Sequence, residues 1–307
     1  MSTLAHHLAE YLRLRRALGF TLEQPSAELP QFLAYLAAAG AETITTELAI
    51  AWAQLPRDVQ PIRWAHRLGA VRGFARYLQT IDPATEVPPA DAFGARQQRP
   101  TPYIWSDAAI DRLLQAARQL QSARRAATYA TLFGLLAVAG LRLGEALQLR
   151  RSDVDLTDGV LLIEAAKFGR IRQVPLHPSA TDALRTYAAD RDQWCPEPRA
   201  ATFFVSTVGT ALDPSVVQHT FNQLTTALGL RTATVRPRLH DLRHTFAVRT
   251  LLAGHAAGIT PDGQVATLST YLGHVSPAGT YWYLEASPAL MAVAAARLER
   301  HLGEQQP

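Results

Sequence analysis

Two arginines in this sequence lie in settings suited to binding an anion. Arg142 follows an apolar run and Gly140, at the predicted start of a helix, where backbone N–H groups favour negative charge. Arg243 lies three residues after His240, so a helix places both side chains on one face. Guanidinium groups donate paired hydrogen bonds to phosphate or carboxylate oxygens. Glu145, three residues after Arg142, is positioned to hold that guanidinium, and the pattern predicts an oxyanion site.

A histidine and a tyrosine near the C-terminus supply groups that move protons or attack an electrophile. His274 follows Gly273, which is expected to end a helix. Imidazole titrates near neutral pH. Tyr283, nine residues later, is the candidate nucleophile. Its neighbours Tyr281 and Trp282 compete with it, although an aromatic cluster is more typical of a core.

The composition singles out one lysine. The chain has 30 Lys and Arg residues, and Lys167 is the one lysine among them. It lies in the turn of a predicted β-hairpin. A partly buried lysine gives up a proton near neutral pH, whereas arginine does not. The turn therefore predicts a proton donor or a phosphate contact, with a solvated surface lysine as the alternative.

The histidines have a competing interpretation as metal ligands. His240 and His244 are four residues apart on a predicted helix, with Asp241 and His274 as further ligands. The pattern lacks the glutamate of a His-Glu-x-x-His motif. The single cysteine, Cys195, excludes a cysteine-based zinc site and an internal disulfide. We expect no metal.

The elements that position these residues are predicted to be mainly α-helical with one small antiparallel sheet, an α+β fold. Helical periodicity predicts four helices in an N-terminal domain, residues 1–82. A proline-rich linker is predicted over 83–104, followed by a second domain over 105–307. In the second domain a hairpin is predicted to pair 160–163 with 171–176. Helices are expected near 108–120, 127–138, 143–149, 178–187, 214–228, 240–252, 262–272, 278–285 and 288–302.

The fourth predicted helix, residues 61–79, carries a stripe of one charge sign. Arg63, Arg67, Arg72 and Arg76 lie off its apolar face, with no acidic residue between the first and the last. Most solvated faces mix both signs. A stripe of arginine alone favours contact with a phosphate backbone, with a solvated face as the alternative.

Length and composition bound the class of protein. The 307 residues suffice for about two domains. Hydrophobic residues make up 48% and charged residues 18%, which excludes wholesale disorder, and the net charge of +4 weakly favours an anionic partner. The longest apolar stretch, residues 130–141, is shorter than the roughly 20 residues that span a bilayer. We expect a soluble cytoplasmic protein with no membrane partner.

In order and spacing, these motifs are similar to those of the tyrosine recombinase (phage integrase) family. The resemblance covers the second domain and extends more loosely to the N-terminal helices, which are similar to the family's core-binding domain. The ending Thr-Tyr-Trp-Tyr-Leu resembles that of recombinases carried on mobile elements. The motifs that carry the resemblance are Gly140-Leu-Arg142 with Glu145, Lys167 followed by Arg172-Gln-Val-Pro-Leu176, His240-Asp-Leu-Arg243, Leu272-Gly-His274 and Tyr283.

The resemblance implies an enzyme that breaks and rejoins DNA strands without ATP, metal or another cofactor. Tyr283 attacks a phosphodiester and forms a 3′-phosphotyrosyl bond, and Lys167 protonates the leaving 5′-oxygen. Arg142 and Arg243 clamp the phosphate. The remaining two catalytic residues are His240 and His274, with Glu145 in a supporting role.

The resemblance also implies partners. Double-stranded DNA is the expected substrate, contacted by the arginines of residues 61–79 and by Arg170 and Arg172. A homo-oligomer, a tetramer on two DNA sites, is expected, with sibling recombinases as further partners and the bacterial nucleoid as the place of action. Whether the C-terminal helix packs in its own protomer or on a neighbour is left open.

Three other functions remain as alternatives. A type IB topoisomerase shares the chemistry and relaxes DNA without a site requirement. A catalytically silent DNA-binding protein would form no covalent adduct. A metal-dependent hydrolase would use His240, His244 and His274 and would lose its activity in chelator. Target sequence and reaction direction (integration, excision, resolution or transposition) also remain open.

Overall fold

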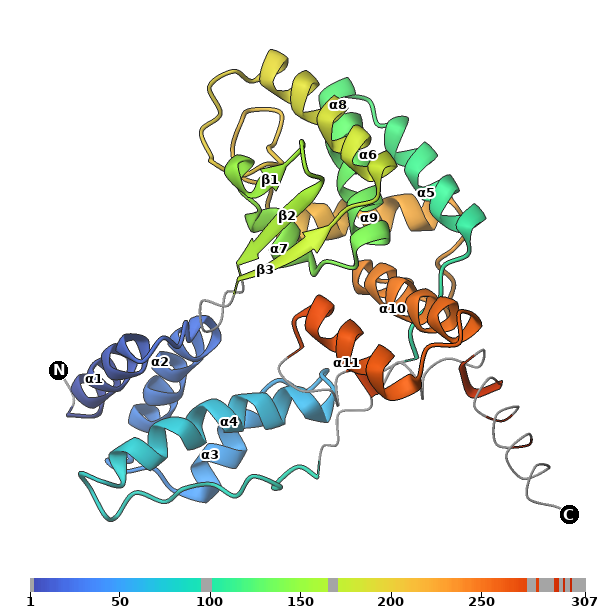
Figure 1. Cartoon of the computed structure of the whole chain (residues 1–307). Helices are drawn as coiled ribbons and strands as arrows, with labels where there is room; N and C mark the ends of the chain where they lie inside the picture. Colours follow the sequence, from blue (N-terminus) through green and yellow to red (C-terminus); the bar gives the residue numbers. More distant parts are fainter. Residues whose placement is uncertain are drawn as a thin grey trace, which may run out of the picture. The chain divides into compact units, whose positions relative to one another are not determined.

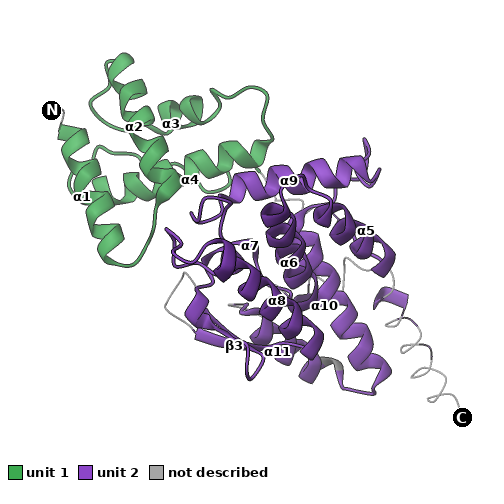
Figure 2. Ribbon diagram, turned by 90° about the horizontal axis from the view of Figure 1, so that it is seen from above, with its two compact units in different colours: residues 1–100 green, residues 101–307 purple. Residues whose placement is uncertain are grey.

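The computed structural model describes residues 3–94, 101–164, 171–274, 280–281 and 290–292, together with Ala295 and Glu299. The chain separates into two compact units, Met1–Pro100 and Thr101–Pro307, drawn in green and purple in Figure 2. Most of the described chain is helical, and one small antiparallel sheet lies in the second unit (Figure 1). The predicted fold class is confirmed.

The first unit is a bundle of four helices around an aromatic core. Thr45 caps the third helix, because its side chain accepts a hydrogen bond from the Leu48 N–H. Phe32, Trp52 and Phe74 are fully buried between the helices. The helices are α1 (Thr3–Ala17), α2 (Glu23–Ala38), α3 (Thr46–Ala53) and α4 (Pro61–Leu78), the last close to the predicted 61–79.

The first unit extends into the segment predicted as a linker. The Glu86 carboxylate accepts a hydrogen bond from the Thr46 N–H at 2.7 Å, and the Glu86 N–H donates to the Ile44 carbonyl at 2.8 Å. Val87 and Phe93 pack on the bundle core. The first part of residues 83–104 is therefore folded against the helices, since its few apolar residues find an apolar surface there.

The second unit has helix α6 (Ala123–Ala139) at its centre. Helices α5 (Asp107–Arg118), α8 (Pro178–Trp194) and α10 (Leu239–Ala256) pack against it. Leu132, Phe133, Phe203 and Phe221 are fully buried in this core. The remaining helices of the described part are α7 (Leu143–Gln148), α9 (Pro214–Ala227) and α11 (Pro261–Leu272).

A three-stranded antiparallel sheet follows α7 in the sequence. After the short 3-10 helix η1 (Arg151–Asp153) come β1 (Val154–Asp155), β2 (Val160–Glu164) and β3 (Ile171–Pro175). The register opposes Val160 to Pro175 and Glu164 to Ile171, as expected for the predicted hairpin. Strand β1 is absent from the sequence-based expectation, because two residues are too short to show an alternating pattern.

Helices α10 and α11 share a second, smaller core. Val248, Leu251, Leu268 and Leu272 are buried between them, and Leu290 packs on the same cluster. The predicted helices over 278–285 and 288–302 lie largely outside the described residues. Over the described part, none of the helices combines the length and apolar character required to cross a membrane.

The start of the second unit is fastened to α10. The Trp105 N–H donates to Thr245 Oγ1 at 2.9 Å, and the Trp105 carbonyl accepts from Arg249 Nη2 at 2.8 Å. Thr245 and Arg249 are one helical turn apart. Ser106 then caps α5, accepting from the Ala109 N–H. Both main-chain groups of Trp105 are thus held by the helix that carries His240 and Arg243.

Candidate active site

The start of α7 holds the first pair of site residues. Gly140 ends α6 in the left-handed conformation, with φ of 59°, and turns the chain into α7. The Arg142 N–H donates to Glu145 Oε2 at 2.9 Å, and Arg142 Nη1 donates to Oε1 at 2.7 Å. The predicted contact between the two residues is present. The Arg142 side chain remains 41% exposed.

Arg243 comes from α10 and is almost completely buried, with 1% exposed. Its Nη1 donates to the Gly140 carbonyl and its Nη2 to the Leu272 carbonyl, both at 2.7 Å. Its Nη1 also lies 3.9 Å from Glu145 Oε2. One guanidinium therefore connects the turn before α7 to the end of α11.

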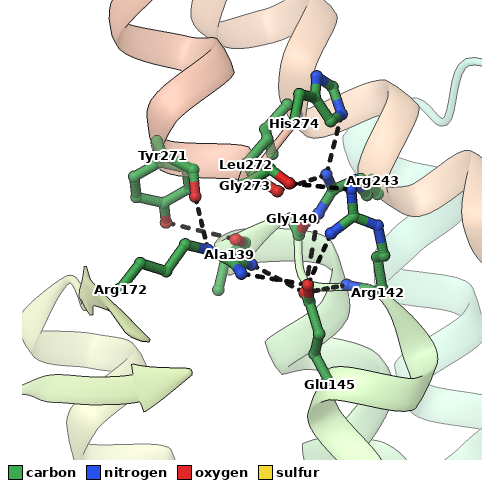
Figure 3. A network of polar contacts seen from close by, with 10 residues as sticks. All are labelled: Ala139, Gly140, Arg142, Glu145, Arg172, Arg243, Tyr271, Leu272, Gly273 and His274. Atoms are coloured by element: carbon green, nitrogen blue, oxygen red, sulfur yellow. Dashed lines mark hydrogen bonds and ion pairs between the residues drawn. The ribbon is translucent and has the colours of Figure 1, made fainter. Parts of the chain in front are cut away.

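The C-terminal end of α11 is bound by three guanidinium groups (Figure 3). Arg172 Nε donates to the Tyr271 carbonyl at 2.9 Å and Arg142 Nη2 to the Gly273 carbonyl at 3.3 Å, on either side of the Leu272 carbonyl that Arg243 holds. The last carbonyls of a helix carry partial negative charge and attract cations. Three consecutive main-chain oxygens thus orient three arginines.

Arg172 differs from its predicted role as a DNA contact. Its side chain is only 14% exposed, and Nη1 and Nη2 donate to the two oxygens of Glu145 at 3.1 and 2.8 Å. A sequence signal existed: side chains alternate along a strand, so Arg172 shares a face of β3 with Val174, which is fully buried. We correct the prediction and place Arg172 inside the site.

Glu145 is the common anion of this network. It accepts hydrogen bonds from Arg142 and Arg172 and lies near Arg243. Burial acts to raise the pKa of its carboxyl, but the hydrogen bonds from Arg172 and from the Arg142 N–H outweigh this and hold the pKa below its usual value. Glu145 is therefore ionised at neutral pH.

His274 lies directly after the α11 terminus and its two ring nitrogens have different partners. Arg243 Nη2 lies 3.0 Å from Nε2, and Thr280 Oγ1 lies 2.7 Å from Nδ1. Arginine only donates, so Nε2 accepts and the proton of the neutral ring is on Nδ1. Burial, and next the charge of Arg243, lower the pKa of His274 to about 4. The ring is neutral at physiological pH.

His240 lies in the first turn of α10 and is exposed, whereas its neighbours Leu239 and Asp241 are buried. Desolvation by the surrounding protein is the main cause that lowers its pKa to about 4, followed by the charge of Arg243. Its ring meets that of His244 edge to face, with centroids 4.5 Å apart. Arg142 also contributes to the low pKa of His240, and His240 to that of His274, so the predicted residues influence one another electrostatically.

Three predicted site residues, Lys167, Arg170 and Tyr283, lie outside the described residues. Tyr281 is described and is about half exposed. Among the described residues, no cluster of three or more His, Cys, Asp or Glu side chains has the arrangement of a metal site.

The arginine stripe of α4 is not a single exposed face. Arg67 is buried, with its guanidinium carbon 3.8 Å from the centre of the Trp52 ring and Nη2 donating to the Trp52 carbonyl at 3.2 Å. Arg63 forms an ion pair of 2.6 Å with Glu28. Arg72 is half-buried and Arg76 exposed. We therefore correct the prediction for Arg67, whose contacts stabilise the bundle.

Comparison with known proteins identifies the family. The family model described as "Phage integrase family" matches residues 106–289. This range includes all the site residues of the second unit named above. The chain belongs to the phage integrase family. The predicted resemblance is confirmed, and the match covers the second unit almost entirely.

Similar proteins match almost the full length of the chain. The chain is 46% identical, over 98% of both sequences, to "Putative integrase/recombinase y4rB" of Sinorhizobium fredii (strain NBRC 101917 / NGR234). It is 31% identical to the tyrosine recombinase XerC of Methylobacterium nodulans (strain LMG 21967 / CNCM I-2342 / ORS 2060), over 90% of this chain and 85% of that protein. Its fold is similar to the Tn1549 transposon integrase in complex with a circular intermediate DNA, with a TM-score of 0.67 and 16% identity over 98% and 100% of the chains.

Proposed function

We propose that this protein is a site-specific DNA recombinase that cuts and rejoins strands through a phosphotyrosyl bond. The observation that carries the proposal is the charge arrangement around Glu145: three guanidinium groups, of Arg142, Arg172 and Arg243, face this single carboxylate. The positive charges exceed the negative charge by two. An exposed arginine beside such a surplus is suited to a phosphodiester, which gains negative charge on its non-bridging oxygens during attack.

The proposed chemistry conserves the energy of the phosphodiester bond. The phenol oxygen of Tyr283 attacks phosphorus and passes its proton to the neutral ring of His240, the bond to the 5′-oxygen breaks, and a 3′-phosphotyrosyl intermediate forms. Lys167 donates a proton to the leaving oxygen. Attack by another 5′-hydroxyl reverses these steps and releases the tyrosine, so the reaction needs neither ATP nor an external nucleophile.

The neutral histidines have a defined role in this scheme. In the free protein His240 and His274 are uncharged because desolvation by the surrounding protein and nearby arginines lower their pKa values to about 4. A bound phosphate brings negative charge beside the rings and raises those pKa values toward neutrality. The His240 ring then becomes able to take up a proton during the reaction and to donate a hydrogen bond to the phosphate. In the free protein both ring nitrogens of His274 are already engaged, by Arg243 and Thr280.

Partners follow from the chemistry of strand exchange. We propose double-stranded DNA as substrate, which the similarity to the DNA-bound transposon integrase supports. Exchange between two duplexes breaks four strands, and one tyrosine per strand requires four protomers, so we propose a tetramer on two sites. The similarity to the transposon integrase, and the resemblance of the ending Thr-Tyr-Trp-Tyr-Leu at 280–284 to that of mobile-element recombinases, support a role on a mobile element. Sibling recombinases and action at the nucleoid belong to the same proposal.

We propose that the first unit binds the DNA backbone and that the second is the catalytic domain. Arg72 and Arg76 of α4 are the exposed or half-exposed arginines available for backbone contact, with Arg170 as a further candidate. Arg63 is partly compensated by its ion pair with Glu28.

The covalent intermediate tests the function. Duplexes selected from a random-sequence pool for binding to the protein are nicked beside the cleavage position, so that the adduct is trapped. We expect wild-type protein and Tyr281→Phe to form the adduct, with or without chelator, and Tyr283→Phe to form none. An adduct that persists in Tyr283→Phe and disappears in Tyr281→Phe would move the nucleophile. Absence of adduct in wild-type protein would refute the recombinase proposal.

A further inference from the structure

We propose that Arg172 is a positioning residue that prevents Glu145 from neutralising Arg142, and thereby preserves the positive charge offered to the scissile phosphate. The inference rests on the proposed recombinase function. It assigns the buried arginine of β3 to the phosphate clamp, although its own donors are engaged by Glu145 and the end of α11.

Arg172 and Arg142 contribute unequal numbers of guanidinium hydrogen bonds to Glu145. Arg172 uses two guanidinium nitrogens, at 2.8 and 3.1 Å, one for each carboxylate oxygen. Arg142 uses one guanidinium nitrogen, at 2.7 Å, and its main-chain N–H at 2.9 Å. Among the described residues, the other terminal nitrogen of Arg142 makes only a long contact of 3.3 Å, to the Gly273 carbonyl. The guanidinium of Arg172 thus binds both carboxylate oxygens, whereas that of Arg142 binds one.

Forked guanidinium–carboxylate pairs are stronger and more directional than single hydrogen bonds. A buried carboxylate that loses its partner remains costly until another cation compensates it. Without Arg172, the cation best placed to do so is Arg142, which is already bonded to Oε1 and is far more exposed than Arg243. Rotation of Arg142 into a forked pair would withdraw its donors from the phosphate.

Arg172 also occupies the space under the end of α11. A Cβ added at Gly273 would lie 2.8 Å from Arg172 Nη1, so the guanidinium lies directly against the glycine backbone. Its Nε holds the Tyr271 carbonyl. Arg172 therefore lowers the pKa of the Glu145 carboxyl and also holds the turn that carries His274.

Arg172→Met tests the inference, because methionine removes the charge and keeps an unbranched side chain. Arg185→Met is the matched control: Arg185 is an exposed arginine of α8 paired with Asp182. The rate of adduct formation is measured at saturating nicked duplex. The Kd for the duplex, the salt dependence of that Kd and the melting temperature of the protein are measured alongside. For Arg172→Met we expect adduct formation about 100-fold slower, as for a misplaced catalytic group, with Kd and salt dependence unchanged. For Arg185→Met we expect the wild-type rate.

The double variant Glu145→Gln/Arg172→Met distinguishes capture of Arg142 by Glu145 from a loss of packing at residue 172. Glutamine removes the negative charge that captures Arg142, so we expect the double variant to form adduct faster than Arg172→Met alone. A double variant no faster than Arg172→Met overturns the inference. So does a weaker Kd with the salt slope reduced by about one, because that result identifies Arg172 as a phosphate contact.

Arg172→Lys covers the case in which Arg172→Met does not fold. Lysine keeps the charge but cannot bind both carboxylate oxygens as a fork. We expect a rate between those of Arg172→Met and wild type, with Kd unchanged, and a wild-type rate for Arg172→Lys overturns the inference. Adduct formation by the wild-type protein is scored separately, so that failure of the recombinase function is distinguished from failure of this positioning role.

Discussion

Replacing Gly140 with alanine tests whether the turn before α7 supports the site. The residue has φ of 59°, in the left-handed region. A Cβ added there would lie 2.5 Å from Cδ1 and 2.9 Å from Cγ of Phe246, closer than such atoms approach in proteins. Phe246 stacks on Tyr271 with ring centroids 5.4 Å apart, and the Gly140 carbonyl accepts from Arg243. Alanine at 140 therefore strains the backbone, displaces the Phe246 ring and disturbs the carbonyl that holds Arg243.

The expected loss of stability follows from two contributions. Left-handed backbone costs an alanine about 1–2 kcal/mol. Displacing the Phe246 ring is an overpacking effect of about 1–3 kcal/mol. We expect Gly140→Ala to lower the free energy of unfolding by about 2–5 kcal/mol in total, and to slow adduct formation because Arg243 loses its alignment.

Urea unfolding measures this change, and Gly144 offers a matched control nearby in the chain. Gly144 lies inside α7, and a Cβ added there meets no atom within 4 Å. Gly144→Ala should be neutral or more stable by up to about 1 kcal/mol, because alanine favours a helix interior. A loss of less than about 1 kcal/mol in Gly140→Ala would refute the steric and backbone reasoning together.

Two further predictions concern single side chains. The pKa of His274 is lowered from 6.5 to about 4, so between these pH values the folded protein binds fewer protons than the unfolded chain. The free energy of unfolding should fall from pH 6.5 to 4, and His274→Asn should reduce that slope; an unchanged slope in urea titrations would contradict the assignment. Arg67→Ala should lower the free energy of unfolding by about 2–4 kcal/mol through the loss of its Trp52 contacts. Exposed Arg76→Ala should stay within about 0.5 kcal/mol, and equal effects of both changes would argue against a structural Arg67.

The residues best predicted from the sequence are those whose partners lie nearby in the chain. Glu145 is three residues from Arg142, and a helix start brings such a pair together. His240 and Arg243 share a face of α10 for the same reason. The hairpin strands are predictable because β2 is rich in apolar residues and β3 follows it closely in the chain. In each case local geometry determines the contact.

The partners of the three arginines cannot be predicted in the same way. Main-chain carbonyls of Gly140, Tyr271, Leu272 and Gly273 have no signature in the amino-acid letters, and helices far apart in the chain bring them to the guanidinium groups. The family resemblance leads to the prediction of Arg172 as a DNA contact, because its partners Glu145 and the Tyr271 carbonyl lie far from it in the chain.

The segment predicted as a linker illustrates a different limit. Its prolines correctly indicate the absence of helix and strand in the described part, but composition does not show whether an irregular segment has an apolar surface to cover. Val87 and Phe93 cover part of the first bundle, and Thr85 is buried.

The oxygens at the end of α11 make the site tolerant of sequence drift. Because Tyr271 and Leu272 present peptide oxygens to the arginines, any residue that preserves the helix keeps these acceptors in place. Packing still constrains two of these positions, since Leu272 is buried between α10 and α11 and Tyr271 stacks on Phe246. Gly273 is constrained by its left-handed turn and the guanidinium beside it. Descendants of this enzyme are therefore free to vary the surface of this helix while inheriting the same reaction centre.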